Sequence, residues 1–295
     1  MRNEPPVWRS MLFVPANVER FVQQAHTRNA DAYILDLEDA VAPSEKANAR
    51  EKVSDAAATI ASNGCDVLVR INRPWRMAVR DMERAVGKNV TALVLPKVAD
   101  ASHLRATAEV VAELEREIGL PLGHTKLVPM IETVAALPES RAIAAADPRV
   151  AAIVLGGEDF SASAGISPEA EALHGPNQEV LMAAHASGCL GLGVVGSIAE
   201  FNDLGKFRSS VERARRLGAQ GSFCIHPAQV AVLNEVFSPP PEVVSAAKAL
   251  VGSYDKAIAE GSGAIVHEGK MIDVPVAERA RELVARAERI ASMPK

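Results

Sequence analysis

Eight short apolar runs recur between residues 11 and 225, and a longer amphipathic stretch follows each of them. The runs occupy residues 11–14, 32–36, 67–71, 92–96, 127–131, 151–155, 190–195 and 221–225. Continuous apolar runs of this length are typical of parallel strands that are buried on both faces, and the three- and four-residue apolar spacing between them predicts helices. Alternating strands and helices form parallel βαβ units, so eight of them predict a closed (β/α)8 barrel, the TIM barrel.

A doubly wound open sheet is the alternative to the barrel. In that fold, a glycine-rich loop follows an early strand and binds the phosphates of a nucleotide. The segment after the first run, FVPANVER at residues 13–20, contains no glycine. The sequence therefore favours the barrel.

The pattern changes after residue 237. Residues 238–244, SPPPEVV, are rich in proline, and a helical pattern then continues to about residue 260. Residues 261–275, GSGAIVHEGKMIDVP, predict a hinge and a short hairpin, and residues 276–291 predict a last amphipathic helix. Because eight units already complete a barrel, we expect residues 1–237 to form it and residues 238–295 to form a C-terminal extension that packs on a neighbouring protomer.

Charge and cysteine content argue against several classes of protein. The formal net charge is −5 and no dense basic tract occurs, which argues against binding to nucleic acid. Cys65, Cys189 and Cys224 are widely spaced and form no CxxC motif, which indicates neither a disulfide framework nor a zinc site. No apolar signal segment starts the chain, and no run approaches the roughly 20 apolar residues of a membrane span. We therefore expect a soluble, cytoplasmic protein.

Acidic side chains follow the fifth and sixth apolar runs. The carboxyl ends of the strands in a barrel meet at one mouth, where barrel enzymes place their chemistry. Mg²⁺ takes one or two protein carboxylates there and completes its octahedron with water and substrate oxygens. We expect Glu132 and Asp159 to bind Mg²⁺, and Glu38 and Asp39, after the second run, to hold the waters of the metal.

Three basic side chains also lie at the ends of runs. The planar fork of Arg70 suits a substrate carboxylate or a developing enolate oxygen, and its alternative role is an ion pair with an acid of the mouth. Lys97 could form a Schiff base if burial lowered its pKa, but neighbouring acids should raise that pKa and favour an electrostatic role. His226 precedes a proline and either caps the last strand or takes part in chemistry.

Eight motifs carry a resemblance to a known family. They are RSMLFVPA (9–16), DAYILDLEDAV (31–41), VRIN (69–72), LPK (95–97), IET (131–133), GGEDF (156–160), IHPAQV (225–230) and GKMIDVP (269–275). In this order, over nearly the whole chain, they resemble the citrate lyase β-subunit-like branch of the HpcH/HpaI aldolase superfamily. That branch includes malyl-CoA and citramalyl-CoA lyases, and the DLEDAV and MIDVP elements are specific rather than generic motifs.

The resemblance implies a Mg²⁺-dependent CoA-ester lyase that cleaves or forms a C–C bond of a 3-hydroxyacyl-CoA, such as malyl-, citramalyl- or citryl-CoA. The products of cleavage would be a 2-oxo acid and an acyl-CoA. The resemblance further implies that Glu132 and Asp159 bind the metal and that Arg70 and Glu132 bind the substrate. Asp273 of one protomer would be the general acid or base in the barrel of its neighbour, within a homotrimer or hexamer. Without the resemblance, Asp273 would be interpreted as a turn residue.

Some segments depart from the common pattern of the family. Gln23 and Gln24 stand where many relatives carry a lysine before alanine, and residues 195–207 have glycine and serine in place of acidic and proline residues. Three rival functions therefore stay open. The first is an acyl-CoA thioesterase or malate-synthase-like variant, and the second is an aldolase for free 2-oxo acids. The third is a β-subunit that is active only in a citrate lyase complex with an acyl-carrier partner.

Overall fold

The computed structural model describes residues 6–199, 201–267 and 269–293. The chain divides into two compact units, residues 1–237 and residues 238–295. The boundary falls at the proline-rich segment that begins at Ser238.

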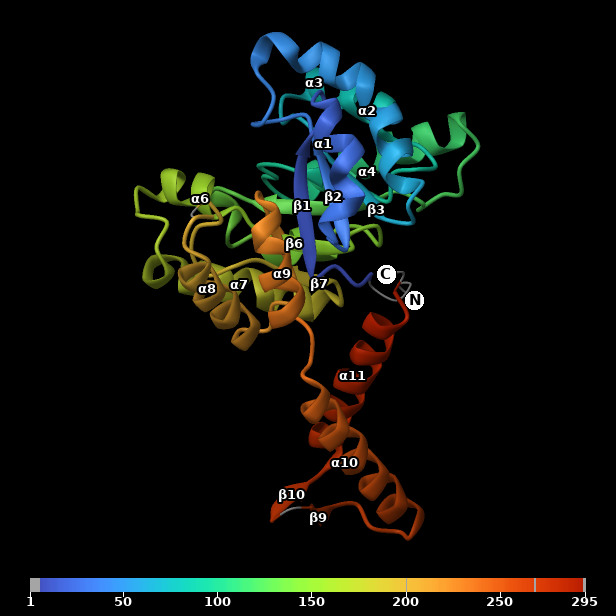
Figure 1. The fold of residues 1–295 in the computed structure, drawn as a ribbon, viewed down its shortest axis with the longest axis vertical. Coiled ribbons are helices and arrows are strands. Elements are labelled where there is room, and N and C mark those ends of the chain that lie inside the picture. Colours follow the sequence, from blue (N-terminus) through green and yellow to red (C-terminus); the bar gives the residue numbers. More distant parts are fainter. Residues whose placement is uncertain (1–5, 200, 268, 294–295) are drawn as a thin grey trace. The chain divides into compact units, whose positions relative to one another are not determined.

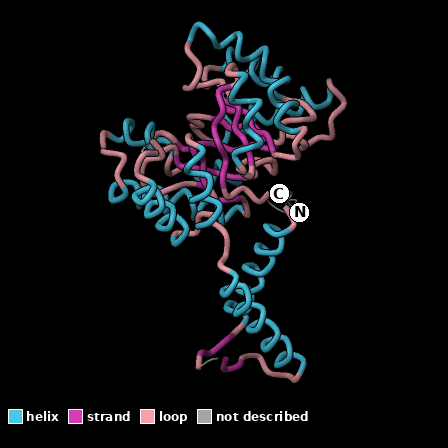
Figure 2. Tube along the Cα trace, in the orientation of Figure 1, coloured by secondary structure: helices cyan, strands magenta, loops and turns pink. Residues whose placement is uncertain are grey.

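The first unit contains a parallel sheet whose strands are surrounded by helices (Figures 1 and 2). The strands are β1 (Ser10–Pro15), β2 (Ala32–Asp36), β3 (Asp66–Arg70), β4 (Ala92–Leu95), β5 (Lys126–Ile131), β6 (Ala152–Leu155), β7 (Leu190–Leu192) and β8 (Ser222–Cys224). Neighbouring strands follow the order β7-β6-β5-β4-β3-β2-β1-β8, and an isolated parallel bridge joins Leu192 to Gly221. This bridge connects the two edges of the sheet, which confirms the predicted barrel and excludes the open sheet.

Each of the eight predicted runs forms a strand, and the largest difference in length concerns β7. This strand ends at Leu192 rather than at residue 195: Gly193 has a φ of 146°, although its N–H still donates to the carbonyl oxygen of Gly221 at 2.9 Å. Residues other than glycine rarely adopt a positive φ of this kind, and a regular strand does not contain it, so the strand ends before Gly193.

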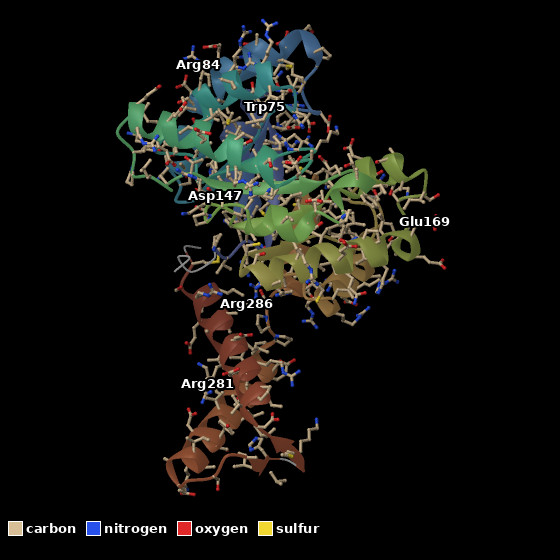
Figure 3. The ribbon with its side chains drawn as sticks, turned by 180° about the vertical axis from the view of Figure 1, so that it is seen from behind. Trp75, Arg84, Asp147, Glu169, Arg281 and Arg286 are labelled. Atoms are coloured by element: carbon tan, nitrogen blue, oxygen red, sulfur yellow. The ribbon has the colours of Figure 1, made fainter. Side chains whose placement is uncertain are left out.

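Helices cover the outside of the barrel. They are α1 (Glu19–Gln24), α2 (Lys46–Ala61), α3 (Trp75–Ala85), α4 (Ala101–Glu117), α5 (Ser140–Ala145), α6 (Gly157–Ala164), α7 (Ala170–Ser187), α8 (Leu204–Arg216) and α9 (Pro227–Val236), with short 3₁₀ turns η1 (Ala25–Arg28), η2 (Pro43–Glu45) and η3 (Val134–Ala136). Trp75 and Arg84, at opposite ends of α3, are labelled in Figure 3.

Alternate residues of the strands serve two different cores. In β5, Leu127 and Ile131 belong to the core between sheet and helices, whereas Val128 and Met130 belong to the core inside the barrel. Both faces of each strand are therefore buried, which is why the sequence shows continuous apolar runs. The same alternation places Glu132, two residues after Met130, on the inner side of the barrel mouth.

The second unit consists of two helices that flank an antiparallel hairpin, as predicted. Its elements are α10 (Pro241–Ala259), β9 (Ile265–His267), β10 (Lys270–Ile272) and α11 (Val274–Ala291). Its buried core consists of Tyr254, Ile272 and Ala277. Arg281 of α11, labelled in Figure 3, forms an ion pair with Asp255 of α10. Among the described residues of both units, no helix has the length and apolar character that a membrane span requires.

Candidate active site

A cavity of about 470 Å³ opens at the carboxyl ends of the strands. Its charged lining side chains are Asp36, Asp39, Arg70, Glu132, Glu158 and Asp159. Apolar side chains also line it, among them Phe13, Met130, Val154 and Phe223. Among the described lining residues, five carboxyl groups thus face one guanidinium group, and the ammonium group of Lys97 contacts one of these carboxyl groups, Asp159, at 3.1 Å. Acids therefore outnumber cations at the mouth, an imbalance that a bound cation would relieve.

Arg70, the last residue of β3, is held by acids from the end of β2. Its Nε and Nη2 donate to the two carboxylate oxygens of Asp36 at 2.8 and 2.7 Å, and its Nη1 lies 3.0 Å from Glu38 and 3.2 Å from Asp39. Below it, the guanidinium carbon lies 4.7 Å from the centre of the Phe13 ring. Burial alone would lower the pKa of Arg70, but the bonds to Asp36 outweigh this effect and raise it. Arg70 is therefore a permanent cation in a fixed orientation.

Asp36 is the group that orients Arg70. Burial alone would raise its pKa, but the hydrogen bonds from Arg70 and from the backbone N–H groups of Ala40 and Glu38 lower it below the ordinary range. Asp36 is therefore ionised and fully partnered, which makes it a supporting residue rather than a free base.

Lys97 joins the two sides of the mouth. Its backbone has a φ of 50°, in the left-handed region, and its N–H donates to Glu132 Oε2 at 2.6 Å. Its Nζ lies 3.1 Å from Asp159 and 3.6 Å from Glu38. Partial burial alone would lower the pKa of Lys97, but the hydrogen bond that its ammonium group donates to Asp159 and the negative charge of Glu38 raise it overall. This rise confirms the expected direction, and a charged ammonium is a poor Schiff-base nucleophile.

Glu132 is buried with little compensation for its charge. Only 2% of its surface is exposed, and burial raises its pKa to about 8 although the N–H of Lys97 opposes that rise. Gly156, at the end of β6, makes room for this side chain. A Cβ at position 156 would lie 2.5 Å from Glu132 Cγ and 2.6 Å from Oε1, which no real contact tolerates. Position 156 therefore requires glycine, because the Glu132 side chain occupies the space that a Cβ atom would fill.

Glu38 has a similar environment. Burial raises its pKa to about 7, against the attraction of Arg70, and its buried Oε2 forms an ion pair at 3.0 Å with Nη1 of that residue. Two buried carboxyl groups with raised pKa values, close to a third at Asp159, are typical of a site that receives an external cation. Among the residues that the structure describes, no cluster of three or more His, Cys, Asp or Glu side chains is arranged to hold a metal by itself. A pair of carboxylates nevertheless suits Mg²⁺, which needs only one or two.

The structure brings together most of the residues that the sequence nominated for the site. Glu38, Asp39, Arg70, Lys97, Glu132 and Asp159 lie at one mouth. Asp273 lies in the second unit, where it caps α11 and accepts a long hydrogen bond of 3.4 Å from the N–H of Val276.

One other rim residue, His226, has a structural role. His226 caps α9 rather than the strand, in a capping box with Gln229, and its ring stacks on Phe201 at 4.9 Å. Two features of the site were not predicted from the sequence. They are the need for glycine at position 156 and the complete set of hydrogen-bond partners of Asp36. Ile34 of β2 faces the interior of the barrel. Because Asp36 lies two residues later on the same strand, the alternation of side chains could have identified it as an acid that also faces the interior.

Comparison with known proteins gives consistent relationships. Residues 9–227 match the HpcH/HpaI aldolase/citrate lyase family. The chain is 32% identical to an L-malyl-CoA/beta-methylmalyl-CoA lyase of Cereibacter sphaeroides, over 96% of each protein, and 32% identical to a (3S)-malyl-CoA thioesterase of the same species, over 99% of each. The crystal structure of the protein CitE from Mycobacterium tuberculosis, in complex with magnesium, acetoacetate and coenzyme A, is 27% identical with a TM-score of 0.74 and covers 98% of this chain and 100% of its own.

Proposed function

Since the chain belongs to the HpcH/HpaI aldolase/citrate lyase family, we propose that it is a cytoplasmic, Mg²⁺-dependent CoA-ester lyase. It would cleave or form the bond between C2 and C3 of a 3-hydroxyacyl-CoA, with a 2-oxo acid and an acyl-CoA on the other side of the reaction. One observation carries the proposal: Glu132, directly after β5, and Asp159, in the first turn of the helix α6 that follows β6, share the mouth with a single oriented guanidinium. The magnesium and coenzyme A bound to the similar protein CitE support it.

Glu132 and Asp159 would hold Mg²⁺. Glu132 is buried, has a raised pKa and accepts a hydrogen bond from Lys97 N, and Asp159 faces the same cavity, so the residues fit a hard divalent cation. When bound, Mg²⁺ would act as a Lewis acid toward the oxygens of the 2-oxo-acid half of the substrate. Glu38 and Asp39 would accept hydrogen bonds from its waters, and Lys97 would hold Asp159 in place.

Arg70 would stabilise the negative charge that moves during cleavage. A carboxylate of the mouth would accept the hydroxyl proton while the C2–C3 bond breaks, and the electron pair of that bond would become the enolate of the acyl-CoA thioester. One proton then returns at C2, so the cleavage is balanced. Because Asp36 fixes two nitrogens of Arg70, the guanidinium does not need to reorganise when charge develops. This orientation is the contribution of the β2 and β3 ends to catalysis.

Asp273 would protonate the enolate at C2, or remove that proton in the condensing direction. Its own hydrogen bond is long, so the carboxyl group is weakly engaged within the second unit. Val266 and Met271, in the hairpin next to it, are 77% and 71% exposed, and such apolar exposure favours contact with another copy of the chain. We accordingly propose a homo-oligomer, with the trimer as the first choice, in which the hairpin of one protomer completes the barrel mouth of the next.

The decisive experiment measures turnover of malyl-, citramalyl- and citryl-CoA beside the free acids, with and without Mg²⁺. We expect Mg²⁺-dependent release of a 2-oxo acid and an acyl-CoA. Activity that survives complete chelation would overturn the metal assignment. For Asp273, we expect Asp273→Asn to lose about 10²–10⁴-fold in kcat. Mixing it with inactive Arg70→Ala protomers should restore activity, because some mouths then receive an intact residue from each parent.

A thioesterase is the second candidate, and the similarity to a (3S)-malyl-CoA thioesterase favours it. In that reaction, water attacks the thioester carbon and Asp273 would act as the base, so free CoA and a hydroxy acid form without C–C cleavage. The two functions differ in their products. Release of malate and free CoA from malyl-CoA, without glyoxylate, would show that the protein is a thioesterase rather than a lyase.

A further inference from the structure

We propose that Arg73 is a positioning residue for the metal site: it holds the backbone of Lys97 in the conformation that directs the N–H group of that residue at Glu132. The inference rests on the proposed function, because it takes Glu132 as a ligand of Mg²⁺. No step of the proposed reaction uses Arg73 itself. Its role follows from the unusual backbone of Lys97 and from the groups that hold this backbone in place.

Lys97 has a backbone conformation that lysine rarely adopts. Its φ of 50° lies in the left-handed region, where the Cβ atom of an ordinary residue crowds the backbone. Among the described residues other than glycine, Asn29 is the one further case, and asparagine adopts this conformation more readily than lysine. Such a conformation persists only where the surrounding structure holds it. The contacts of Lys97 must therefore supply what its own backbone preference does not.

In this conformation Lys97 contacts both proposed metal ligands. Its N–H donates to Glu132 Oε2 at 2.6 Å, and its Nζ lies 3.1 Å from Oδ1 of Asp159. Among the described contacts, the first of these is the one hydrogen bond that the carboxyl group of Glu132 receives. A change in the backbone of Lys97 would turn this N–H away and release the Glu132 side chain.

Arg73 holds the carbonyl end of the same residue. Its Nε donates to the carbonyl oxygen of Lys97 at 2.9 Å, and this is the one hydrogen bond of the Arg73 side chain among the described contacts. Because the donor is charged, the bond is stronger than a hydrogen bond between neutral groups. The backbone of Lys97 is thus fixed at two points, by Glu132 at its N–H and by Arg73 at its carbonyl oxygen.

The loop that carries Arg73 is itself fixed. It connects Arg70, the last residue of β3, to α3, and Asn72 anchors it. The N–H and the Nδ2 of Asn72 donate to Asp81 Oδ2 at 2.8 and 2.7 Å, and Nδ2 also donates to the carbonyl oxygen of Leu37 at 2.9 Å. Asn72 is 4% exposed and Asp81 is fully buried. Arg73 therefore acts from a rigid support, which a group that orients another residue requires.

Charge and positioning predict opposite effects when Arg73 is removed. The guanidinium group repels a cation at the mouth, so the loss of its charge alone would tighten the binding of Mg²⁺. The loss of positioning would weaken this binding, because the carboxyl group of Glu132 is then no longer held in place. The direction of the change in Mg²⁺ affinity therefore separates the two roles.

Calorimetric titration with Mg²⁺ alone measures this direction. We expect Arg73→Ala to weaken binding about tenfold, the lower limit for loss of a group that orients a metal ligand. Arg73→Lys keeps a charged donor and should recover part of the affinity. Arg76→Ala is the matched control, because it removes an exposed arginine from the first turn of α3, and its affinity should equal or slightly exceed that of the wild type. An affinity of Arg73→Ala equal to or above that of the wild type would overturn the proposal.

A backbone variant makes the test specific to Lys97. Asparagine adopts the left-handed region more readily than lysine, as Asn29 does with a φ of 55°, so Lys97→Asn needs less support from Arg73. In the Lys97→Asn background, Arg73→Ala should weaken Mg²⁺ binding by about threefold or less, instead of about tenfold. An undiminished loss in that background would show that Arg73 acts by another route and would contradict the proposal.

A measurement without metal separates this inference from the proposed function. In the nuclear magnetic resonance spectrum of the metal-free protein, a short hydrogen bond to a carboxylate moves the amide proton of Lys97 downfield and protects it from exchange with solvent. Arg73→Ala should move this resonance upfield and speed its exchange, whereas Arg76→Ala should change neither. If Arg73→Ala does not fold, Arg73→Met, which keeps the aliphatic stem, replaces it in each comparison.

The two assignments can fail independently. If the wild-type protein binds no Mg²⁺ but the Lys97 resonance responds to the loss of Arg73, the metal assignment fails and the positioning role stands. An unchanged Lys97 resonance in the folded variant rejects the positioning role, whatever the protein binds or catalyses.

Discussion

Buried carboxyl groups occur at both ends of the barrel, but their surroundings differ sharply. At the amino ends of the strands, Glu115 is fully buried and accepts two hydrogen bonds from Arg149 and two from the N–H groups of Gly123 and Thr125. At the carboxyl ends, Glu132 is almost as buried and its one hydrogen bond among the described contacts comes from the N–H of Lys97.

The consequence appears in the pKa values. Burial alone would raise the pKa of Glu115, but Arg149 and the two backbone N–H groups lower it. Burial raises the pKa of Glu132 to about 8 and that of Glu38 to about 7. In Figure 3, Asp147, in the loop that enters β6, and Glu169, in the loop beyond α6, mark the amino and carboxyl sides of this part of the barrel. Burial is thus common to both ends, whereas incomplete pairing distinguishes the candidate site from structural ion pairs.

The largest effect should follow removal of a proposed metal ligand. We expect Asp159→Ala to lower Mg²⁺-dependent kcat/KM by more than about 100-fold, because loss of an outer-shell partner alone costs about 10–100-fold. The barrel should stay folded, since Asp159 is partly exposed and its described partner is Lys97. Steady-state kinetics and thermal melting measure the two effects. Near-normal activity of the variant would place the metal elsewhere.

The opposite result is expected at the amino end. Arg149→Ala leaves the buried carboxylate of Glu115 without its cation, which should lower the free energy of unfolding by about 3–5 kcal/mol. The kcat of the folded fraction should not change, because neither residue lines the cavity. Denaturant unfolding and kinetics at low temperature test both statements. A loss of kcat without a loss of stability would contradict the division between the two ends.

Much of the fold could be predicted because each strand is buried on both faces and therefore appears in the sequence as a continuous apolar run. The rim residues Glu132 and Arg70 followed from their place beside such runs. The pairing of acids could not be predicted in this way. Glu115 finds its cation 34 residues away and Glu132 finds its donor 35 residues away, so partnership is a property of the closed barrel.

Other features of the site also depend on closure. The requirement for glycine at 156 arises from the approach of the side chain of Glu132, the residue that directly follows the neighbouring strand β5. The motif GGEDF itself does not show whether a glycine is needed because a side chain from another strand packs against it or because the chain turns there. The cap role of His226 likewise depends on where α9 begins, at the proline that follows it.

The fit between Gly156 and Glu132 gives an intermediate effect. We expect Gly156→Ala to displace the Glu132 carboxylate and to weaken Mg²⁺ binding by about 10–100-fold, as for other groups that orient a ligand. Calorimetric titration with Mg²⁺ measures this directly. Gly175→Ala is the control, because a Cβ there meets no atom within 4 Å, and it should bind Mg²⁺ normally. Equal affinities for all three proteins would show that Gly156 has no role in positioning.

The smallest effect concerns pH and follows from the raised pKa of Glu132. Its folded-state pKa of about 8 lies above the ordinary value of 4.5, so the metal-free side chain holds a proton at pH 7. Mg²⁺ must displace that proton, and its affinity should therefore rise about tenfold per pH unit from pH 6 to 8 and level off above. Calorimetry in buffers of different ionisation enthalpy should detect the released proton. In Glu132→Gln, the part of the pH dependence of Mg²⁺ affinity that is due to this residue should disappear. A wild-type affinity that stays constant from pH 6 to 8 would instead show that Glu132 is already ionised. Incomplete pairing would then not distinguish the two ends of the barrel.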